Sequence, residues 1–175
     1  MEAARELTGI TAVAELTTSL RRIRSRLDAD TAVVLTLDPT RRVLEPFAMS
    51  GLDRSQRVWV RVPVGKGFSG KVAATRTPLV LDEVTESNVY NPILRESGLR
   101  SLVGVPLFDD HDLIGVLHVG SFTPRRFDDG EVADLATLGD EVVELIRHTR
   151  TGAMHTAALV LQRSLIPTIP PRVPG

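Results

Sequence analysis

The chain has 175 residues, 42% of them apolar and 25% charged, which suits one soluble globular domain with helical flanks and excludes two full-sized domains. The formal net charge of -1 gives no general attraction to nucleic acid or to an anionic membrane, so neither is expected as a partner. The absence of cysteine excludes disulfide bonds, thiolate metal sites and cofactors attached through sulfur.

A long helix is expected at the start of the chain. Apolar residues recur there three or four positions apart, with Arg and Glu between them. The stripe comprises Leu7, Ile10, Val13, Leu16, Leu20, Ile23 and Leu27. This spacing predicts an amphipathic helix that ends near Asp28.

Three β segments follow this helix. Residues 32–37 and 43–49 flank the turn 38–41 and predict a hairpin. Because proline cannot donate a hydrogen bond to a neighbouring strand, Pro46 places the second strand at an edge or at a bulge. Residues 58–64 alternate and predict a third strand.

The middle of the chain is a succession of short elements. A glycine-rich turn at 65–70 precedes a short helix at 71–75, and 79–81 predicts a brief strand. The polar segment 82–97 follows, in which the pair Asn91-Pro92 breaks any helix that forms.

The clearest β signal is a hairpin expected at the centre of the sheet. Residues 101–108 and 113–119 are both rich in apolar and β-branched side chains, and 109–112 supplies a polar turn between them. By alternation, His118 shares one face of its strand with Ile114 and Val116.

A second long helix is predicted to begin after Thr123-Pro124. Asp128 and Glu131 stand at the spacing of a capping box, with carboxylates at the positive end of the helix. A near-heptad stripe carries this helix to about Leu165. The stripe comprises Val132, Leu135, Val142, Ile146, Ala153, Ala157 and Val160. Four of the eleven prolines lie in 167–175, which predicts a non-helical linker.

These elements predict an α+β fold, an antiparallel sheet with helices packed on it. Tight turns between adjacent strands argue against a parallel doubly wound sheet, which needs a crossover of roughly a dozen residues or more. The glycines at 65–70 formally match the motif of dinucleotide-binding and kinase folds. Pro78 would interrupt the crossover helix of the first, and the sequence lacks the catalytic loop of the second. A close strand-to-helix turn is the simpler interpretation.

Four segments resemble, in order and spacing, the successive signatures of a GAF domain. They are 64–73 (VGKGFSGKVA), 77–82 (TPLVLD), 99–107 (LRSLVGVPL) and 114–119 (IGVLHV). The resemblance implies a six-stranded antiparallel sheet with the terminal helices packed on one face and short helices capping a small-molecule pocket on the other. It also implies dimerisation through the terminal helices, which relay a pocket signal to an attached output domain.

The resemblance divides the chain into four parts. They are an N-terminal helix (1–30), a GAF core sheet (31–127), a C-terminal signalling helix (128–166) and a proline-rich linker to an output domain (167–175).

The end of the chain bears a second resemblance. Segments 161–167 (LQRSLIP) and 170–175 (PPRVPG) are similar to the entry segment of bacterial metal-dependent serine phosphatases of the protein phosphatase 2C type. GAF domains often precede that catalytic domain, whose acidic metal-binding motifs would lie beyond Gly175. We therefore expect a regulatory chain without enzymatic activity of its own and a phosphatase-type output domain.

The resemblance leaves the ligand class open. GAF domains that attach bilins or reduce free methionine sulfoxide use cysteine, so the sequence excludes both. Cyclic-nucleotide-binding members carry an Asn-Lys pair followed by Phe and acidic residues. Phe127 with its downstream acids matches this pattern in part, but the Asn-Lys pair is absent. A cyclic nucleotide therefore stays an alternative, and a structural dimerisation domain without a ligand is another.

The candidate ligand-binding residues fall in segments that the resemblance places around the pocket. Three of them are aromatic, Trp59, Phe68 and Tyr90, and their rings would form the walls of a site for a planar ligand. Plain core packing of these rings is the competing interpretation.

The polar candidates are Asn91, Arg100, Ser101 and His118. Arg100 alone could meet an anion with two hydrogen bonds. His118 could ligate haem iron, although a hydrogen-bonded core histidine is the commoner role. The remaining histidines and the acidic turn at 109–112 show no metal-ligand spacing, so no metal is predicted, and the cofactor is unknown.

The combined hypothesis is a cytoplasmic homodimeric sensor that binds an unidentified small molecule. The start of the sequence has no secretory signal pattern, and no apolar run approaches the roughly 18 residues of a membrane span. Val142 and Ile146, on the last helix, are the expected dimer contacts.

Overall fold

One antiparallel sheet organises the fold. The computed structural model describes residues 2–52 and 60–164. The strand order is β3-β2-β1-β6-β5-β4, and every neighbouring pair is antiparallel. In chain order the elements are α1 (Glu2–Arg26), β1 (Thr31–Leu37), β2 (Val43–Ser50), β3 (Val62–Pro63), α2 (Gly67–Thr75), β4 (Leu79–Leu81), α3 (Pro92–Glu96), β5 (Ser101–Asp109), β6 (Asp112–Ser121) and α4 (Asp129–Ser164).

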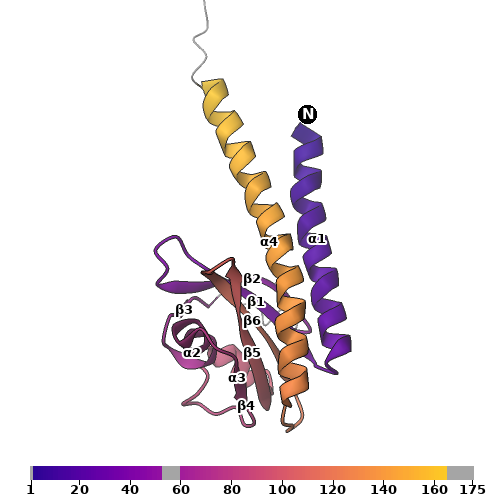
Figure 1. Ribbon diagram of the computed structural model, residues 1–175, viewed down its shortest axis with the longest axis vertical. Helices are drawn as coiled ribbons and strands as arrows, with labels where there is room; N and C mark the ends of the chain where they lie inside the picture. Colours follow the sequence, from indigo (N-terminus) through magenta and orange to yellow (C-terminus); the bar gives the residue numbers. More distant parts are fainter. Residues whose placement is uncertain (1, 53–59, 165–175) are drawn as a thin grey trace, which may run out of the picture.

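The helices divide between the two faces of the sheet. The long helices α1 and α4 lie side by side along one face, and α2 and α3 cover the other (Figure 1). Each face has its own apolar cluster: Leu20, Leu117 and Ile146 are buried on the first, and Phe68 and Val116 on the second. The predicted α+β architecture, with terminal helices on one face and short helices on the other, is confirmed.

The strongest sequence signals correspond to observed elements. The predicted hairpins are β1–β2 and β5–β6, and β4 matches its predicted span. In the β1–β2 ladder, Val34 pairs with Ala48 and Leu35 with Pro46, so Phe47 is skipped. This irregularity is the bulge that Pro46 led us to expect.

The short elements depart from the prediction. Strand β3 contains only Val62 and Pro63, and the earlier part of the expected strand, with Trp59, lies outside the described residues. Helix α2 begins at Gly67 rather than at Lys71, so part of the glycine-rich segment is helical. A side chain at Gly70 would collide with the carbonyl oxygen of Pro63, so this first turn packs directly on the strand before it.

A bulge in β6 changes which residues share a face. Leu107 pairs with Gly115 and Phe108 with Leu113, so Ile114 is skipped in the ladder. Ile114 therefore packs in the apolar cluster beneath α1 and α4, which we call the helix-side cluster. Val116 packs on the opposite face. The expectation that His118 shares a face with Ile114 is wrong for this reason, whereas its relation to Val116 is correct.

The capping box of the last helix is present. The main-chain N–H of Glu131 donates to Asp128 Oδ1 (2.8 Å), and the main-chain N–H of Asp128 donates to Glu131 Oε2 (2.9 Å). Two main-chain donors that the first helical turn would leave open are thus satisfied. Helix α4 accordingly begins at Asp129.

The stripe on α4 packs inside its own protomer. Leu135, Val142 and Ile146 are fully buried in the helix-side cluster against α1 and the sheet. Val142 and Ile146 therefore stabilise the folded chain, and the expectation that they form dimer contacts is wrong. In the described part of the chain, no helix is both long and apolar enough to cross a membrane.

We predict that Ile146→Ala lowers the free energy of unfolding by about 2–5 kcal/mol, because it leaves a cavity in a closed core. Thr137→Ala, at an exposed position of the same helix, should change it by less than about 0.5 kcal/mol. Urea unfolding followed by circular dichroism measures both. Equal stabilities for the two variants would contradict the assignment of Ile146 to the core.

Candidate functional site

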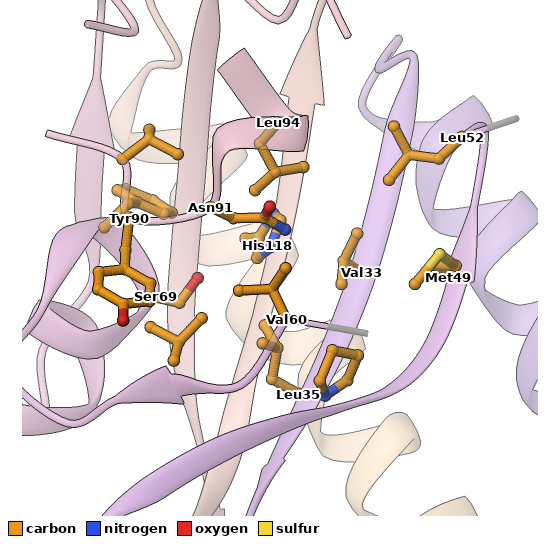
Figure 2. A pocket seen from close by; sticks show the side chains of 14 residues that line it. Val33, Leu35, Met49, Leu52, Val60, Ser69, Tyr90, Asn91, Leu94 and His118 are labelled. Carbon is orange, nitrogen blue, oxygen red and sulfur yellow. The ribbon is translucent and has the colours of Figure 1, made fainter. Parts of the chain in front are cut away.

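A pocket lies on the sheet face opposite α1 and α4. It is enclosed by β1, β2 and β6 on one side and by α2 and the segment before α3 on the other (Figure 2). Its volume is about 40 Å³. The lining consists of Val33, Leu35, Pro46, Met49, Leu52, Val60, Val62, Phe68, Ser69, Val89, Tyr90, Asn91, Leu94 and His118.

His118 is the most deeply buried polar group of the pocket. Strand β6 holds it with only 1% of its surface exposed. Burial lowers the pKa of the imidazole to about 4, because the charged form loses its hydration. The ring is therefore neutral at pH 7. Its Nδ1 has no hydrogen-bond partner in the described part of the chain.

Glycine on the neighbouring strand makes room around this imidazole. Gly104 pairs with His118 across β5 and β6, and Phe68 reaches over both from α2. A Cβ atom at Gly104 would lie 2.8 Å from Cε1 of Phe68 and 3.3 Å from Cβ of His118. The Phe68 ring meets the imidazole edge-on, with centroids 6.0 Å apart and an interplanar angle of 88°. The glycine thus permits an aromatic side chain to cover the histidine.

The outer wall comes from the segment between β4 and α3. Tyr90 and Asn91 line the pocket there, and Tyr90 is 46% exposed at the rim. Gly67 has a φ of +58°, and a Cβ at this position would lie 2.9 Å from Cα of Tyr90. The wall is anchored to the sheet by a bond from the main-chain N–H of Val84 to the carbonyl of Arg100 (2.8 Å).

No charged side chain lines this pocket within the described residues. Its polar side chains are Ser69, Tyr90, Asn91 and His118, and the other ten lining residues are apolar. With His118 neutral, the described lining offers hydrogen bonds but no formal charge. It can therefore hold a largely apolar molecule with a few polar contacts.

The structure brings four of the seven predicted site residues to this pocket, namely Phe68, Tyr90, Asn91 and His118. Trp59 lies outside the described residues. Whether the four bind a ligand stays a prediction.

Arg100 and Ser101 lie away from the pocket. The Arg100 side chain is exposed, and its main-chain N–H donates to the carbonyl of Ser121 (2.8 Å). Ser101 is fully buried, and its hydroxyl donates to the carbonyl of Thr123 (3.1 Å). Arg100 therefore joins the start of β5 to the last residue of β6, and Ser101 joins it to the chain that follows β6.

Sequence reasoning missed Ser69 and the apolar lining contributed by β1 and β2. Ser69 lies in the glycine-rich segment, which signals a close turn but does not show that the serine faces a pocket. No group of three or more His, Asp or Glu side chains suited to a metal ion occurs among residues 2–52 and 60–164.

The chain resembles solved structures of one fold. A GAF domain from the phosphoenolpyruvate-protein phosphotransferase of Coxiella burnetii superposes with a TM-score of 0.67, at 20% identity, over 85% of this chain and 98% of that one. The free methionine-R-sulfoxide reductase of Neisseria meningitidis superposes with a TM-score of 0.66, at 22% identity, over 80% of both chains. At these identities the likeness shows a shared fold.

Similar curated proteins are longer than this chain. The HTH-type transcriptional activator RamA of Corynebacterium glutamicum is 30% identical over 109 residues, which are 59% of this chain and 35% of that protein. The Nif-specific regulatory protein of Herbaspirillum seropedicae is 28% identical over 149 residues, 79% of this chain and 28% of that protein. The chain thus spans about a third of the length of these relatives.

The family model of the GAF domain matches residues 12–146, from the middle of α1 to the part of α4 that packs on the sheet. The match includes every strand and the whole lining of the pocket. The chain belongs to the GAF domain family.

Proposed function

We propose that this chain is a sensor module that binds a small molecule in the pocket around His118 and regulates an attached output domain. The observation that carries the proposal is a buried imidazole that lines a mainly apolar pocket and whose Nδ1 lacks a partner among the described residues (Figure 2). An unpaired buried polar atom is unfavourable, and a ligand that bonds to it would remove that cost.

The central strands provide a direct route from the pocket to the signalling helix. Gly104 and His118 face the pocket, while their neighbours Val105 and Leu117 face α4. Gly139 lets α4 approach closely, since a Cβ there would lie 3.0 Å from the Leu107 side chain. A ligand that displaces β5 or β6 would therefore act on α4 across the thickness of one sheet.

The length of the relatives supports an attached output domain. RamA and the Nif-specific regulatory protein each extend well beyond the part that this chain matches. A phosphatase-type output is the specific form that we propose, and it rests on the resemblance of segments 161–167 and 170–175 to a phosphatase entry segment.

We further propose that a second copy of the chain packs on the groove between α1 and α4. The groove has a volume of about 610 Å³, and the ion pair between Arg22 and Glu141 crosses it. Glu15 and Glu144 make its lining acidic, whereas Arg21 is exposed on α1 and forms no ion pair with another described residue. Acidic and basic helix surfaces on each copy give a two-fold pair complementary charges.

A structural dimerisation domain without a ligand is the second candidate function. The pocket volume of about 40 Å³ favours it, because this space suits only a few water-sized atoms unless the outer wall moves. A cyclic nucleotide is disfavoured by the same site, because no cation among the described lining residues would pair with a phosphate.

Native mass spectrometry of freshly purified protein tests the pocket. The wild-type chain should carry a small molecule that is released on denaturation. Val33→Phe, which fills the pocket from β1, should abolish this added mass. Val80→Phe makes the same change on the helix-side face, and this variant should retain the added mass of the small molecule. A bare wild-type chain would favour the structural candidate, and an added mass that survives Val33→Phe would contradict the proposed site.

Sedimentation velocity tests the dimer surface. Ala14 and Thr18 are exposed and line the groove. The double variant Ala14→Glu, Thr18→Glu adds two charges beside Glu15 and should shift the protein from dimer to monomer. Ala136→Glu, exposed on α4 outside the groove, should remain dimeric. Persistent dimerisation of the double variant would rule out this groove as the interface.

A further inference from the structure

The lining of the pocket limits the charge of its occupant. A buried ion needs an opposite charge or several hydrogen bonds to replace its hydration. None of the described lining residues carries a charge, and Arg100, the one cation that the sequence associated with the site, is exposed elsewhere. Among residues 2–52 and 60–164, a carboxylate or phosphate in this pocket would therefore lose hydration without a compensating cation in the lining.

The position of His118 defines the most deeply buried polar contact of the described lining. The ring lies at the floor of the pocket, on β6, with Phe68 edge-on to it. A neutral imidazole has one N–H donor and one nitrogen acceptor, and it can exchange the two between its nitrogens. Nδ1 can thus accept from an O–H or N–H group, or donate to a carbonyl oxygen. Either bond would pair the atom that the described residues leave without a partner.

From these observations we infer that the ligand is an uncharged, largely apolar molecule that forms a hydrogen bond with Nδ1 of His118. This inference rests on the proposed sensor function and adds the chemical class of the ligand. Amides, phenols and alcohols with an apolar body belong to this class, whereas carboxylates, phosphates and nitrate do not.

The size of the pocket indicates how such a ligand enters. A volume of about 40 Å³ is too small for an aromatic ring, since a cavity of roughly 150 Å³ is known to hold benzene. Tyr90, at 46%, is the most exposed of the described lining residues, so a ring would have to displace the outer wall that it forms. The wall contacts α2 at Gly67, so its movement would be passed to the helix that carries Phe68.

Three probes of similar size test the inference on the intact chain. Benzamide is uncharged and forms hydrogen bonds, benzoate has the same shape with a negative charge, and toluene forms no hydrogen bond. NMR with ¹⁵N-labelled histidine follows the ring nitrogens of His118 during each titration. We expect benzamide to bind and to shift the Nδ1 resonance. Toluene should bind about tenfold more weakly without that shift, and benzoate more weakly still.

The variant His118→Phe keeps a ring of similar size and removes the hydrogen-bonding nitrogens. This variant should bind benzamide only as tightly as it binds toluene. If it does not fold, the shift of the Nδ1 resonance in the wild-type chain still shows whether benzamide forms a hydrogen bond with His118. Benzoate binding as tightly as benzamide would overturn the inferred ligand class while leaving a small-molecule sensor intact. Failure of all three probes to bind would instead count against the proposed function itself.

Discussion

The burial of one imidazole is the constraint on which the site depends. His118 lies inside the domain because β6 runs through the middle of the sheet, with α2 above it and α4 beneath. A charged histidine would be unstable there, and a neutral one requires a partner for Nδ1 that the described residues do not supply. Gly104 and Phe68 complete the arrangement, because the missing side chain at one position admits the ring of the other.

The same strands serve two functions because side chains alternate between the faces of a sheet. On β5 and β6 one set of residues, which includes Gly104 and His118, faces the side of the pocket, and the intervening set forms the core beneath α1 and α4. Binding and signalling therefore do not require separate elements. An ion pair between Arg147 of α4 and Asp109 at the β5–β6 turn adds a second contact between this hairpin and the helix.

Local patterns predicted most of the fold, and long-range packing accounts for what they missed. The two hairpins and the Asp128 capping box depend on neighbouring residues, so the sequence predicts them correctly. The bulge at Ile114 follows from how β5 and β6 pair, and alternation alone misplaced this residue. Val142 and Ile146 belong to an apolar stripe, but such a stripe does not reveal whether it packs against the same chain or against a second copy. Arg100 and Ser101 belong to the signature segment 99–107 but are not part of the described pocket lining, because a place in a signature does not fix the direction of a side chain.

The protonation of His118 is the most direct test, because the proposed ligand class and the proposed coupling of the pocket to α4 both require a buried neutral imidazole. An NMR titration of the ring nitrogens in the folded chain measures this pKa. We expect His118 to stay neutral from pH 8 down to about pH 5 and to protonate near its pKa of about 4. Because the unfolded chain protonates at the ordinary value of about 6.5, stability should fall as the pH is lowered between these values. A ring that titrates in the folded chain near 6.5 would show that the imidazole is hydrated, and would contradict the account.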